Sequence, residues 1–344
     1  MKINVKKLSE LAGVSPATVS NALNHKRGVN PETARQILEL AAQYGYEPTE
    51  KIHCIRIVRY FDSGEIVTDV PFFNDLLATI EELSRRNGYE TKLVNLYRHR
   101  EDYADCVKEL LRDASSAVLF LGTELRREDA RVFLGAKMPF LLVDTHFDDL
   151  PFHTVLMHNE SPVYHSVNLL IEKGHTKIGY LRSAAKSQNF SRRYRGFVRA
   201  MSEAGLPVET DFCYELPPTL VGAHDSFAAA LEEKRELPTA FVAGNDMIAL
   251  GAMKALQERG IAVPQDISLI GFDDIAFGAV SSPSLTTVHL DNRAMGETAV
   301  KRLLELIRDP DQAPVSIELY TSLIERDSVA AAADKQPVRE KERI

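Results

Sequence analysis

The sequence predicts an α/β protein with a small helical N-terminal unit and a larger two-lobed body, each lobe built on a parallel sheet. Three short helices fit within the first fifty or so residues, and each carries a start or stop signal. From about residue 52, strand-like and helix-like segments alternate in two successive series. The chain of 344 residues leaves roughly 290 for the body, a size that usually divides into two cores.

The first two predicted helices are joined by a tight turn. Gly13 ends the first helix because it has no Cβ to oppose the left-handed backbone that such a turn needs. Ser15 can cap the second helix, and Pro16 occupies its first position, where a missing N–H costs nothing. Apolar residues recur along one face of the first helix, at Val5, Leu8, Leu11 and Ala12.

The second helix has one apolar and one polar face. Its apolar residues, Val19, Ala22 and Leu23, are expected in a core. Short hydrogen-bonding side chains remain on the outer face, namely Thr18, Ser20, Asn21 and Asn24. Such a helix suits insertion into the major groove of DNA. A surface helical hairpin with one polar face would show the same spacing.

The third predicted helix completes the unit. It begins at the capped segment Asn30-Pro31-Glu32-Thr33 and ends at Gly45. Residues 1–51 carry seven Lys or Arg against five Asp or Glu, whereas the remainder carries 34 against 44. An acidic chain with a basic N-terminal segment keeps its phosphate-binding charge in one place. The charge pattern therefore favours the DNA-binding interpretation.

These segments resemble a known family. The run Ser15-Pro16-Ala17-Thr18-Val19-Ser20, with Ala12-Gly13-Val14 before it and Tyr46-Glu47-Pro48 after it, is similar to the headpiece of the LacI/GalR family of bacterial transcriptional regulators. The resemblance implies base reading by Pro16, Ala17 and Asn21, of which Asn21 could pair with adenine through two hydrogen bonds. The full set of residues expected to contact DNA is Asn4, Ser15, Pro16, Ala17, Thr18, Ser20, Asn21, Asn24, Asn30 and Thr33.

Composition excludes several other classes of protein. Three scattered cysteines, Cys54, Cys106 and Cys213, give neither a disulfide framework nor a metal spacing and suit a reducing cytosol. The longest apolar runs are of strand length, so we expect no membrane partner and a cytoplasmic location. The sequence lacks H-E-x-x-H, G-x-S-x-G, Walker and G-x-G-x-x-G motifs. We therefore expect no enzyme, no cofactor and no metal.

The body is predicted from about residue 52 onward as two strand–helix series. The first contains strands near 55–58, 89–95, 116–121 and 139–143 and helices near 72–87, 102–112 and 126–134. The second contains helices near 160–173, 192–204, 222–233 and 246–259 and strands near 177–181, 212–215, 238–243 and 267–271. In such folds, ligands bind outside the carboxyl ends of the strands. Two facing lobes would place those ends around a cleft.

The resemblance extends through this body. Similar segments are Gly244-Asn245-Asp246-Met247, Ile270-Gly271-Phe272-Asp273, Ser282-Pro283-Ser284-Leu285 and Leu323-Ile324-Glu325-Arg326. It implies a periplasmic-binding-protein-like body in which the chain crosses between lobes near 156–160, 287–291 and 314–318. The expected domains are a headpiece at 1–48, a shortened linker at 49–51, a core at 52–328 and a disordered tail at 329–344. Within the core, the first lobe comprises about 52–157 and 289–315, and the second comprises about 158–288 and 316–328.

Polar residues at strand ends are the candidates for ligand contacts. Asp144, Asn245 and Asp273 each follow a buried strand, and Arg193 is expected in the first turn of a helix, where the helix dipole would oppose its charge. The resemblance implies that these four residues bind an effector and that Phe73, with Phe72, forms an apolar wall. Either phenylalanine could instead belong to the core. We expect Asp246 to be a helix cap and Arg192 and Arg195 to be solvated.

Two segments depart from the family pattern. The family places about a dozen residues, including a hinge helix with a wedging leucine, between the headpiece and the first strand. Here only Thr49-Glu50-Lys51 separates Pro48 from Ile52, so we expect no hinge helix and weaker or differently spaced operator binding. The loop Asp62 to Val70 is longer and acidic, and we expect it at the mouth of the cleft.

The resemblance as a whole implies a homodimeric repressor that binds a pseudo-palindromic DNA operator. Its effector would be a small molecule between the lobes, with a sugar that controls carbohydrate-use genes as the main hypothesis. Nucleobases are effectors in this family as well. A solute receptor for transport and an enzyme are the alternatives from other classes, and the helix-turn-helix argues against both.

Overall fold

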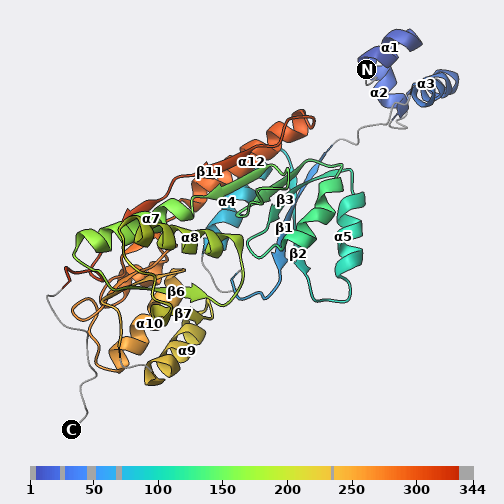
Figure 1. Cartoon of the computed structure of the whole chain (residues 1–344). Coiled ribbons are helices and arrows are strands. Elements are labelled where there is room, and N and C mark those ends of the chain that lie inside the picture. The colour runs from blue at the N-terminus through green and yellow to red at the C-terminus, as the bar shows by residue number, and fades with distance from the viewer. Residues whose placement is uncertain (1–4, 24–27, 45–51, 67–71, 234–235, 333–344) are drawn as a thin grey trace. The chain divides into compact units, whose positions relative to one another are not determined.

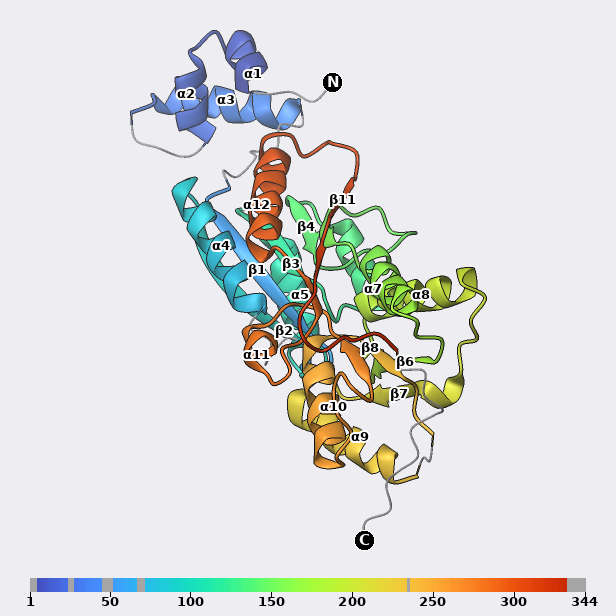
Figure 2. The same ribbon diagram turned by 90° about the vertical axis from the view of Figure 1, so that its left-hand side faces the viewer.

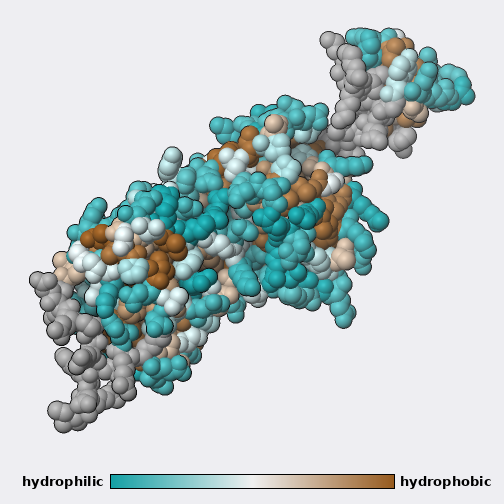
Figure 3. Space-filling view, viewed as in Figure 1, coloured by the Kyte–Doolittle hydropathy of each residue, from teal (hydrophilic) through white to brown (hydrophobic). Residues whose placement is uncertain are grey.

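A computed structural model describes residues 5–23, 28–44, 52–66, 72–233 and 236–332. The chain divides into two compact units, residues 1–51 and 52–344 (Figure 1). None of the described helices is long and apolar enough to cross a membrane. In the view of Figure 3, the surface of the larger unit is mostly hydrophilic, with scattered apolar patches.

The N-terminal unit is a three-helix core. Its helices are α1 (Val5–Ala12), α2 (Pro16–Leu23) and α3 (Pro31–Gln43). Gly13 has φ of +66°, which confirms the predicted glycine turn. Ser15 Oγ accepts a hydrogen bond from the Thr18 amide at 3.1 Å, as expected of a cap. The core consists of Leu8, Val19, Ala22, Leu23, Ile37 and Ala41, whereas Leu11 is exposed.

The first lobe of the body contains a six-stranded parallel sheet in the order β11-β5-β4-β3-β1-β2. Its strands are β1 (Cys54–Phe61), β2 (Glu90–Tyr97), β3 (Ser116–Leu121), β4 (Phe140–Val143), β5 (Thr154–Met157) and β11 (Ser316–Leu319). Side chains alternate between its two faces. Helices α4 (Phe72–Arg86) and α12 (Asn292–Arg308) pack on one face, as Figure 2 shows. Helices α5 (Tyr103–Arg112) and α6 (Arg127–Ala130) and the 3-10 turn η1 (Arg131–Gly135) pack on the other.

The second lobe contains a four-stranded parallel sheet in the order β7-β6-β8-β9. Its strands are β6 (Ile178–Ser183), β7 (Cys213–Leu216), β8 (Ala240–Ala243) and β9 (Ser268–Ile270). Helices α7 (Glu160–Glu172) and α8 (Gln188–Glu203) cover one face, and α9 (Leu220–Glu233) and α10 (Asp246–Glu258) cover the other. A short turn η2 (Thr210–Phe212) precedes β7, and α11 (Ala276–Val280) follows β9.

The chain passes between the lobes three times, and one predicted crossing is wrong. The first two connect β5 to α7 and β10 (Thr287–His289) to α12. The third was expected at 314–318, but β11 pairs with β5 along Ser316–Leu319, so this segment belongs to the first lobe. The crossing therefore lies between β11 and β12 (Ser322–Ile324), which pairs antiparallel with β10.

The tail was predicted to be disordered from residue 329, but the chain is still bound to the second lobe at residues 330 and 332. The amide of Ala330 donates to Ser268 Oγ at 3.1 Å, and its carbonyl oxygen accepts from His175 Nε2 at 3.1 Å. The amide of Ala332 donates to the Lys173 carbonyl oxygen at 2.8 Å. Residues 329–332 are thus fixed to the second lobe, because their backbone groups bond to it. The rest of the tail, 333–344, and the linker at 49–51 lie outside the described residues.

Candidate functional site

A cavity lies in the body at the carboxyl ends of strands from both sheets. The space between its lining residues is about 390 Å³ when the part open to solvent is counted. The structure brings all five predicted ligand residues into its lining. The complete lining is Ile66, Phe73, Thr123, Asp144, Ser187, Asn189, Phe190, Arg193, Asn245, Asp273 and Leu290.

Asp144 presents a buried carboxyl from the first lobe. It follows β4 with φ of +61°, a left-handed conformation that few residues other than glycine adopt. Its Oδ2 accepts from Thr123 Oγ1 at 2.6 Å and its Oδ1 from Asn189 Nδ2 at 3.0 Å. Burial nevertheless raises the pKa of Asp144 to about 6, although Thr123 and Arg193 act in the opposite direction.

Arg193 is the buried cation of the cavity. Its Nε donates to Asn159 Oδ1 at 2.9 Å and its Nη1 to the carbonyl oxygen of Gly244 at 2.7 Å. The guanidinium also lies 3.6 Å from the ring centroid of Phe272. It was expected in the first turn of its helix, but α8 begins at Gln188, so its interaction with the helix dipole is weaker than predicted.

Asp273 supplies a second buried carboxyl, from the second lobe. It follows β9 and has φ of +117°. Its Oδ1 lies 3.4 Å from Arg193 Nη2. Burial raises the pKa of Asp273 to about 7; Arg193 lowers it, and the nearby carboxylates of Asp246 and Asp144 raise it further. The strained backbone and the buried carboxyl of Asp273 both reduce the stability of the fold. Such features are typical of residues in functional sites.

The cap of α10 is Asn245 and not Asp246. Asn245 Oδ1 accepts from the Ile248 amide at 3.0 Å, so Asn245 caps α10 while it lines the cavity. Asp246 is fully buried and accepts from Thr287 Oγ1 at 2.6 Å and from the Ile275 amide at 2.9 Å. The prediction of a cap at Asp246 is therefore wrong, because its carboxyl joins loops of the second lobe.

Sequence reasoning missed Asn189. Its Nδ2 donates to the Asp144 carboxylate and also to the Asp144 carbonyl oxygen, both at 3.0 Å. Its Oδ1 accepts from Asn159 Nδ2 at 3.2 Å. Asn189 precedes Arg193 by four residues, the spacing of one helix face, and that was the signal available in the sequence.

The neighbouring arginines of α8 differ from each other. Arg195 is largely exposed, as expected. Arg192 was also expected to be solvated, but its side chain is only 13% exposed and its Nη1 donates to Glu318 at 2.9 Å. The expectation for Arg192 is wrong. Glu318 belongs to β11 of the first lobe, and the ion pair with it holds Arg192 between the two lobes instead of in solvent.

A buried carboxylate holds the described part of the acidic loop, residues 62–66. Glu124 is 2% exposed, and its Oε2 accepts from the amides of Asp62, Ser63 and Gly64 at 2.7–2.9 Å. Its Oε1 accepts from the Ile66 amide at 3.0 Å. The loop is therefore fixed beside the cavity, which Ile66 lines. Residues 67–70 of the predicted loop lie outside the described residues.

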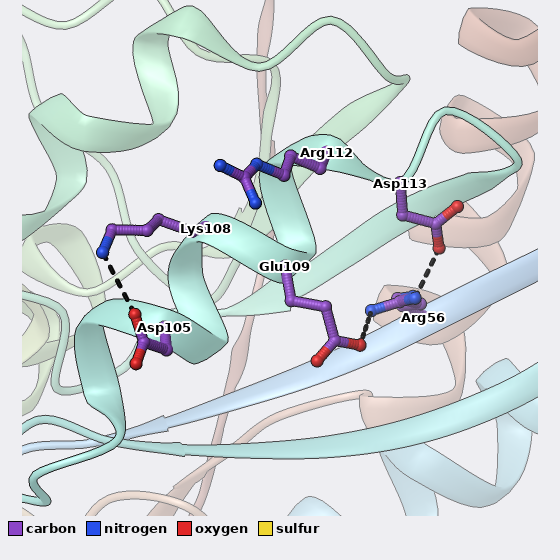
Figure 4. A pocket seen from close by; sticks show the side chains of 6 residues that line it. All are labelled: Arg56, Asp105, Lys108, Glu109, Arg112 and Asp113. Atoms are coloured by element: carbon purple, nitrogen blue, oxygen red, sulfur yellow. Dashed lines mark hydrogen bonds and ion pairs between the residues drawn. The ribbon is translucent and has the colours of Figure 1, made fainter.

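Another hollow, on the α5 face of the first lobe, is filled with ion pairs (Figure 4). Arg56 lies 3.6 Å from Glu109 and also contacts Asp113, and Lys108 Nζ lies 3.0 Å from Asp105. Because its acids neutralise its cations, this hollow is a weak candidate for a ligand site. In the described residues, no group of His, Cys, Asp and Glu side chains could hold a metal ion.

The residues predicted to contact DNA lie on and around α2. Ser15, Pro16 and Ala17 are exposed at its start, and Thr18, Ser20 and Asn21 are half-buried along it. Asn30 is exposed and caps α3 through the Glu32 amide at 2.9 Å, and Thr33 is half-buried. Asn4 and Asn24 lie outside the described residues. The N-terminal helix pair therefore presents short polar side chains at the start of a helix.

Together, a helix-turn-helix unit and a two-lobed body with a ligand cavity define a class of protein, the ligand-responsive regulators that bind DNA. The family model for bacterial regulatory proteins of the lacI family matches residues 5–49. A model for a periplasmic binding protein-like domain matches residues 167–329.

Curated relatives and solved structures agree with these models. The HTH-type transcriptional repressor PurR of Glaesserella parasuis is 30% identical over 94% of this chain and 98% of its own length. PurR of Actinobacillus pleuropneumoniae is 32% identical with the same coverage. The lac repressor dimer bound to operator and the anti-inducer ONPF gives a TM-score of 0.72 at 24% identity, over 96% of this chain and 100% of that one. The Escherichia coli repressor ascG gives 0.68 at 25% identity, over 81% and 100%.

The chain belongs to the LacI family and is a DNA-binding transcriptional repressor rather than an enzyme.

Proposed function

We propose that this repressor binds a pseudo-palindromic operator as a homodimer and is controlled by a small sugar bound between the lobes of its body. The genes it represses would then serve carbohydrate use, and it would act in the cytoplasm, where its DNA lies. Effector binding would favour one arrangement of the lobes and thereby change the operator affinity. Coupling of this kind is typically worth ~1–3 kcal/mol.

The observation that carries the sugar hypothesis is the pair Asp144 and Asp273. One carboxyl comes from each lobe, and both line the same cavity together with Arg193 and Asn245. Carboxylates accept two hydroxyl protons each, and a guanidinium donates to two adjacent oxygens. Vicinal hydroxyls of a sugar would donate to both carboxyls, one from each lobe, in addition to the donors that Asp144 already has in Thr123 and Asn189. Such a ligand would draw the lobes together.

A nucleobase is the second candidate. Phe73 of the first lobe and Phe190 of the second both line the cavity. Aromatic side chains from both lobes could contact the faces of a planar base. The residues Asp144 and Asp273 count against it, since a purine offers fewer donors to two carboxyls than a sugar does.

Dimerisation is proposed from exposed apolar side chains on two helices of the second lobe. Phe277 and Val280 of α11 are 61% and 81% exposed, and Leu220 and Val221 at the start of α9 are exposed as well. A second copy of the chain is the natural cover, because a palindromic operator requires two headpieces. Sedimentation of Val280→Asp against wild type tests this: a monomer is expected, and an unchanged mass excludes this surface.

The first experiment is a thermal-shift screen of the full chain with monosaccharides, disaccharides, sugar phosphates and purines. A ligand at about 100 times its Kd stabilises by ~2.7 kcal/mol, which is easily detected. The same titration is repeated with Asp273→Ala and with Asp311→Ala, an exposed acid outside the cavity. A sugar hit that is lost only in Asp273→Ala supports the proposal. A purine hit with no sugar hit replaces it with the nucleobase.

A further inference from the structure

Helix α8 of the second lobe is attached to the first lobe at two places. Asn189, in the first turn of the helix, donates to Asp144, which follows β4. Arg192 is three residues further along and therefore on the same side of the helix, and it contacts Glu318 of β11. Two attachment points about one turn apart restrain the rotation of the helix as well as its distance from the first lobe.

The ion pairs of Arg192 cross the interface between the lobes. Its Nη1 lies 2.9 Å from Glu318 Oε1, and its Nη2 lies 3.5 Å from Asp148 Oδ1, in the loop after β4. Arg192 is mostly buried and Glu318 is about 28% exposed, so solvent screens this pair less than it screens a surface pair. Arg192 is not part of the lining of the ligand cavity. Its side chain is therefore available to hold the lobes rather than an effector.

Glu318 lies where two of the three crossovers run side by side. The amide of His158, in the first crossover, donates to the carbonyl oxygen of Leu319 at 2.9 Å. The ring of His158 is stacked on that of Tyr320, in the third crossover, with centroids 5.0 Å apart. Glu318 Oε2 also lies 3.5 Å from His158 Nδ1. Through Glu318, Arg192 is thus connected to two of the segments that join the lobes.

Two further arginines of α8 pair within their own lobe. Arg195 Nε lies 3.5 Å and Arg199 Nη1 lies 3.2 Å from the carboxylate of Glu160, the first residue of α7. A pair inside one lobe is the same in every arrangement of the lobes. The pair of Arg192 with Glu318, by contrast, forms only when α8 and β11 are close. It therefore stabilises the arrangement seen here, the closed arrangement, relative to any in which the lobes have separated.

We infer that the pair Arg192–Glu318 is an interlobe latch, which favours the closed arrangement of the body before an effector binds. The inference rests on the proposed function only in that the lobes must move. An effector that contacts both lobes binds the closed arrangement, and its apparent Kd falls as the fraction of closed molecules rises. Arg192 is thus a positioning residue that increases effector affinity without touching the effector.

The test measures the distance between the lobes in the full-length protein, without ligand, by double electron–electron resonance. The spin labels are attached to two cysteines that replace exposed alanines, Ala104→Cys on α5 and Ala229→Cys on α9. The three native cysteines, Cys54, Cys106 and Cys213, are replaced by serine. Labelled chain is diluted with unlabelled chain so that only distances within one chain are observed. We expect one main distance, that of the closed arrangement.

Arg192→Gln should raise the ratio of open to closed molecules about fivefold, which corresponds to about 1 kcal/mol. Arg192→Glu should raise it further, because two carboxylates would then face each other across the interface. Adding Glu318→Arg to Arg192→Glu should restore the closed distance, since the ion pair is formed again in reverse. Arg195→Glu, opposite Glu160 within the second lobe, is the matched control and should leave the distances unchanged.

Three results would overturn the latch. The first is an unchanged distance in both Arg192 variants, and the second is an equal change in Arg195→Glu. The third is a change in Arg192→Glu that Glu318→Arg does not reverse, because the effect would then not come from this pair. Arg192→Gln keeps a polar side chain and is expected to fold even if Arg192→Glu does not. Since no effector is added, the sugar proposal can fail while the latch stands, and the reverse.

Discussion

The side-chain amide of Asn189 donates to two oxygens of Asp144, the backbone carbonyl and a carboxylate, each at 3.0 Å. Asn189 belongs to α8 of the second lobe, and Asp144 follows β4 of the first. This contact therefore joins the lobes at the centre of the predicted effector site. Since Asn189 also contacts Asn159 at the first crossover, it connects the cavity to a segment in which the chain passes between the lobes.

We predict that Asn189→Ala destabilises the body by about 1–3 kcal/mol, because buried oxygens lose their donor. It should also weaken effector binding, since the lobes lose a contact that holds them together around the cavity. Urea denaturation and ligand titration measure the two effects. Ser191→Ala, an exposed residue of the same helix, is the control. Wild-type stability and affinity in Asn189→Ala would show that the contact is dispensable.

The buried carboxyls should make the stability of the body depend on pH. Burial raises the pKa of Asp144 and Asp246 to about 6 and that of Asp273 to about 7, against 3.8 for an ordinary aspartate. Between these limits the folded protein holds protons that the unfolded chain has released. The free energy of unfolding attributable to these groups therefore falls as the pH rises from about 4 to 7.

In wild type, the free energy of unfolding should fall between pH 5 and pH 8. Asp273→Asn should make this fall smaller, by about 1–3 kcal/mol. Denaturation of the ligand-free protein across that range measures it, with Asp311→Asn as the exposed control. The same substitution should abolish effector binding. A pH profile identical to wild type would mean that Asp273 is ionised throughout.

Asn21 is predicted to read one base pair in each half-site. Asn21→Ala should reduce discrimination at that position by ~1–3 kcal/mol and leave binding to other positions unchanged. Binding to a library of operator variants measures the effect, and Gln36→Ala on α3 serves as the control in the same unit. An equal loss for all sequences would instead make Asn21 a phosphate contact.

The separate cores of the two units should allow one to unfold without the other. Leu8 is fully buried in the small N-terminal core, so Leu8→Ala should cost ~2–5 kcal/mol there. That is comparable to the whole stability of such a small unit. We expect loss of operator binding with unchanged effector binding. Lower effector affinity in Leu8→Ala would contradict the independence of the cores.

The parts of the fold with strong periodicity were predictable from sequence. Helix α4 and strand β3 match the predicted ranges closely, because an amphipathic helix and a fully apolar strand each carry a clear pattern. Strands β5 and β11 were not predicted. Helix α12 was also missed, although its buried apolar residues recur with helical spacing and could have been recognised. β5 is four residues long, and β11 is half-exposed at the sheet edge, so neither shows a distinctive period.

The site was predictable to the extent that it depends on strand ends. Asp144, Asn245 and Asp273 follow buried strands, and the structure gathers them at one cavity. Asn189 and Glu124 were missed because their roles depend on contacts with distant segments. The Glu124 carboxylate accepts from amides about sixty residues earlier in the chain, a relationship that spacing within one helix or strand does not reveal.

The late placement of β11 and β12 has a consequence for synthesis of the chain. Each lobe is completed by a segment near the C-terminus: β11 covers the edge of β5 in the first lobe, and β12 pairs with β10 beside the second. While the ribosome is still translating, both lobes thus expose unpaired strands and apolar surface, a state prone to aggregation. A nonsense mutation just before Ser316 would remove β11 and β12 and leave both lobes unfinished. We therefore expect the loss of β11 and β12 to abolish function as completely as the loss of the DNA-binding helices.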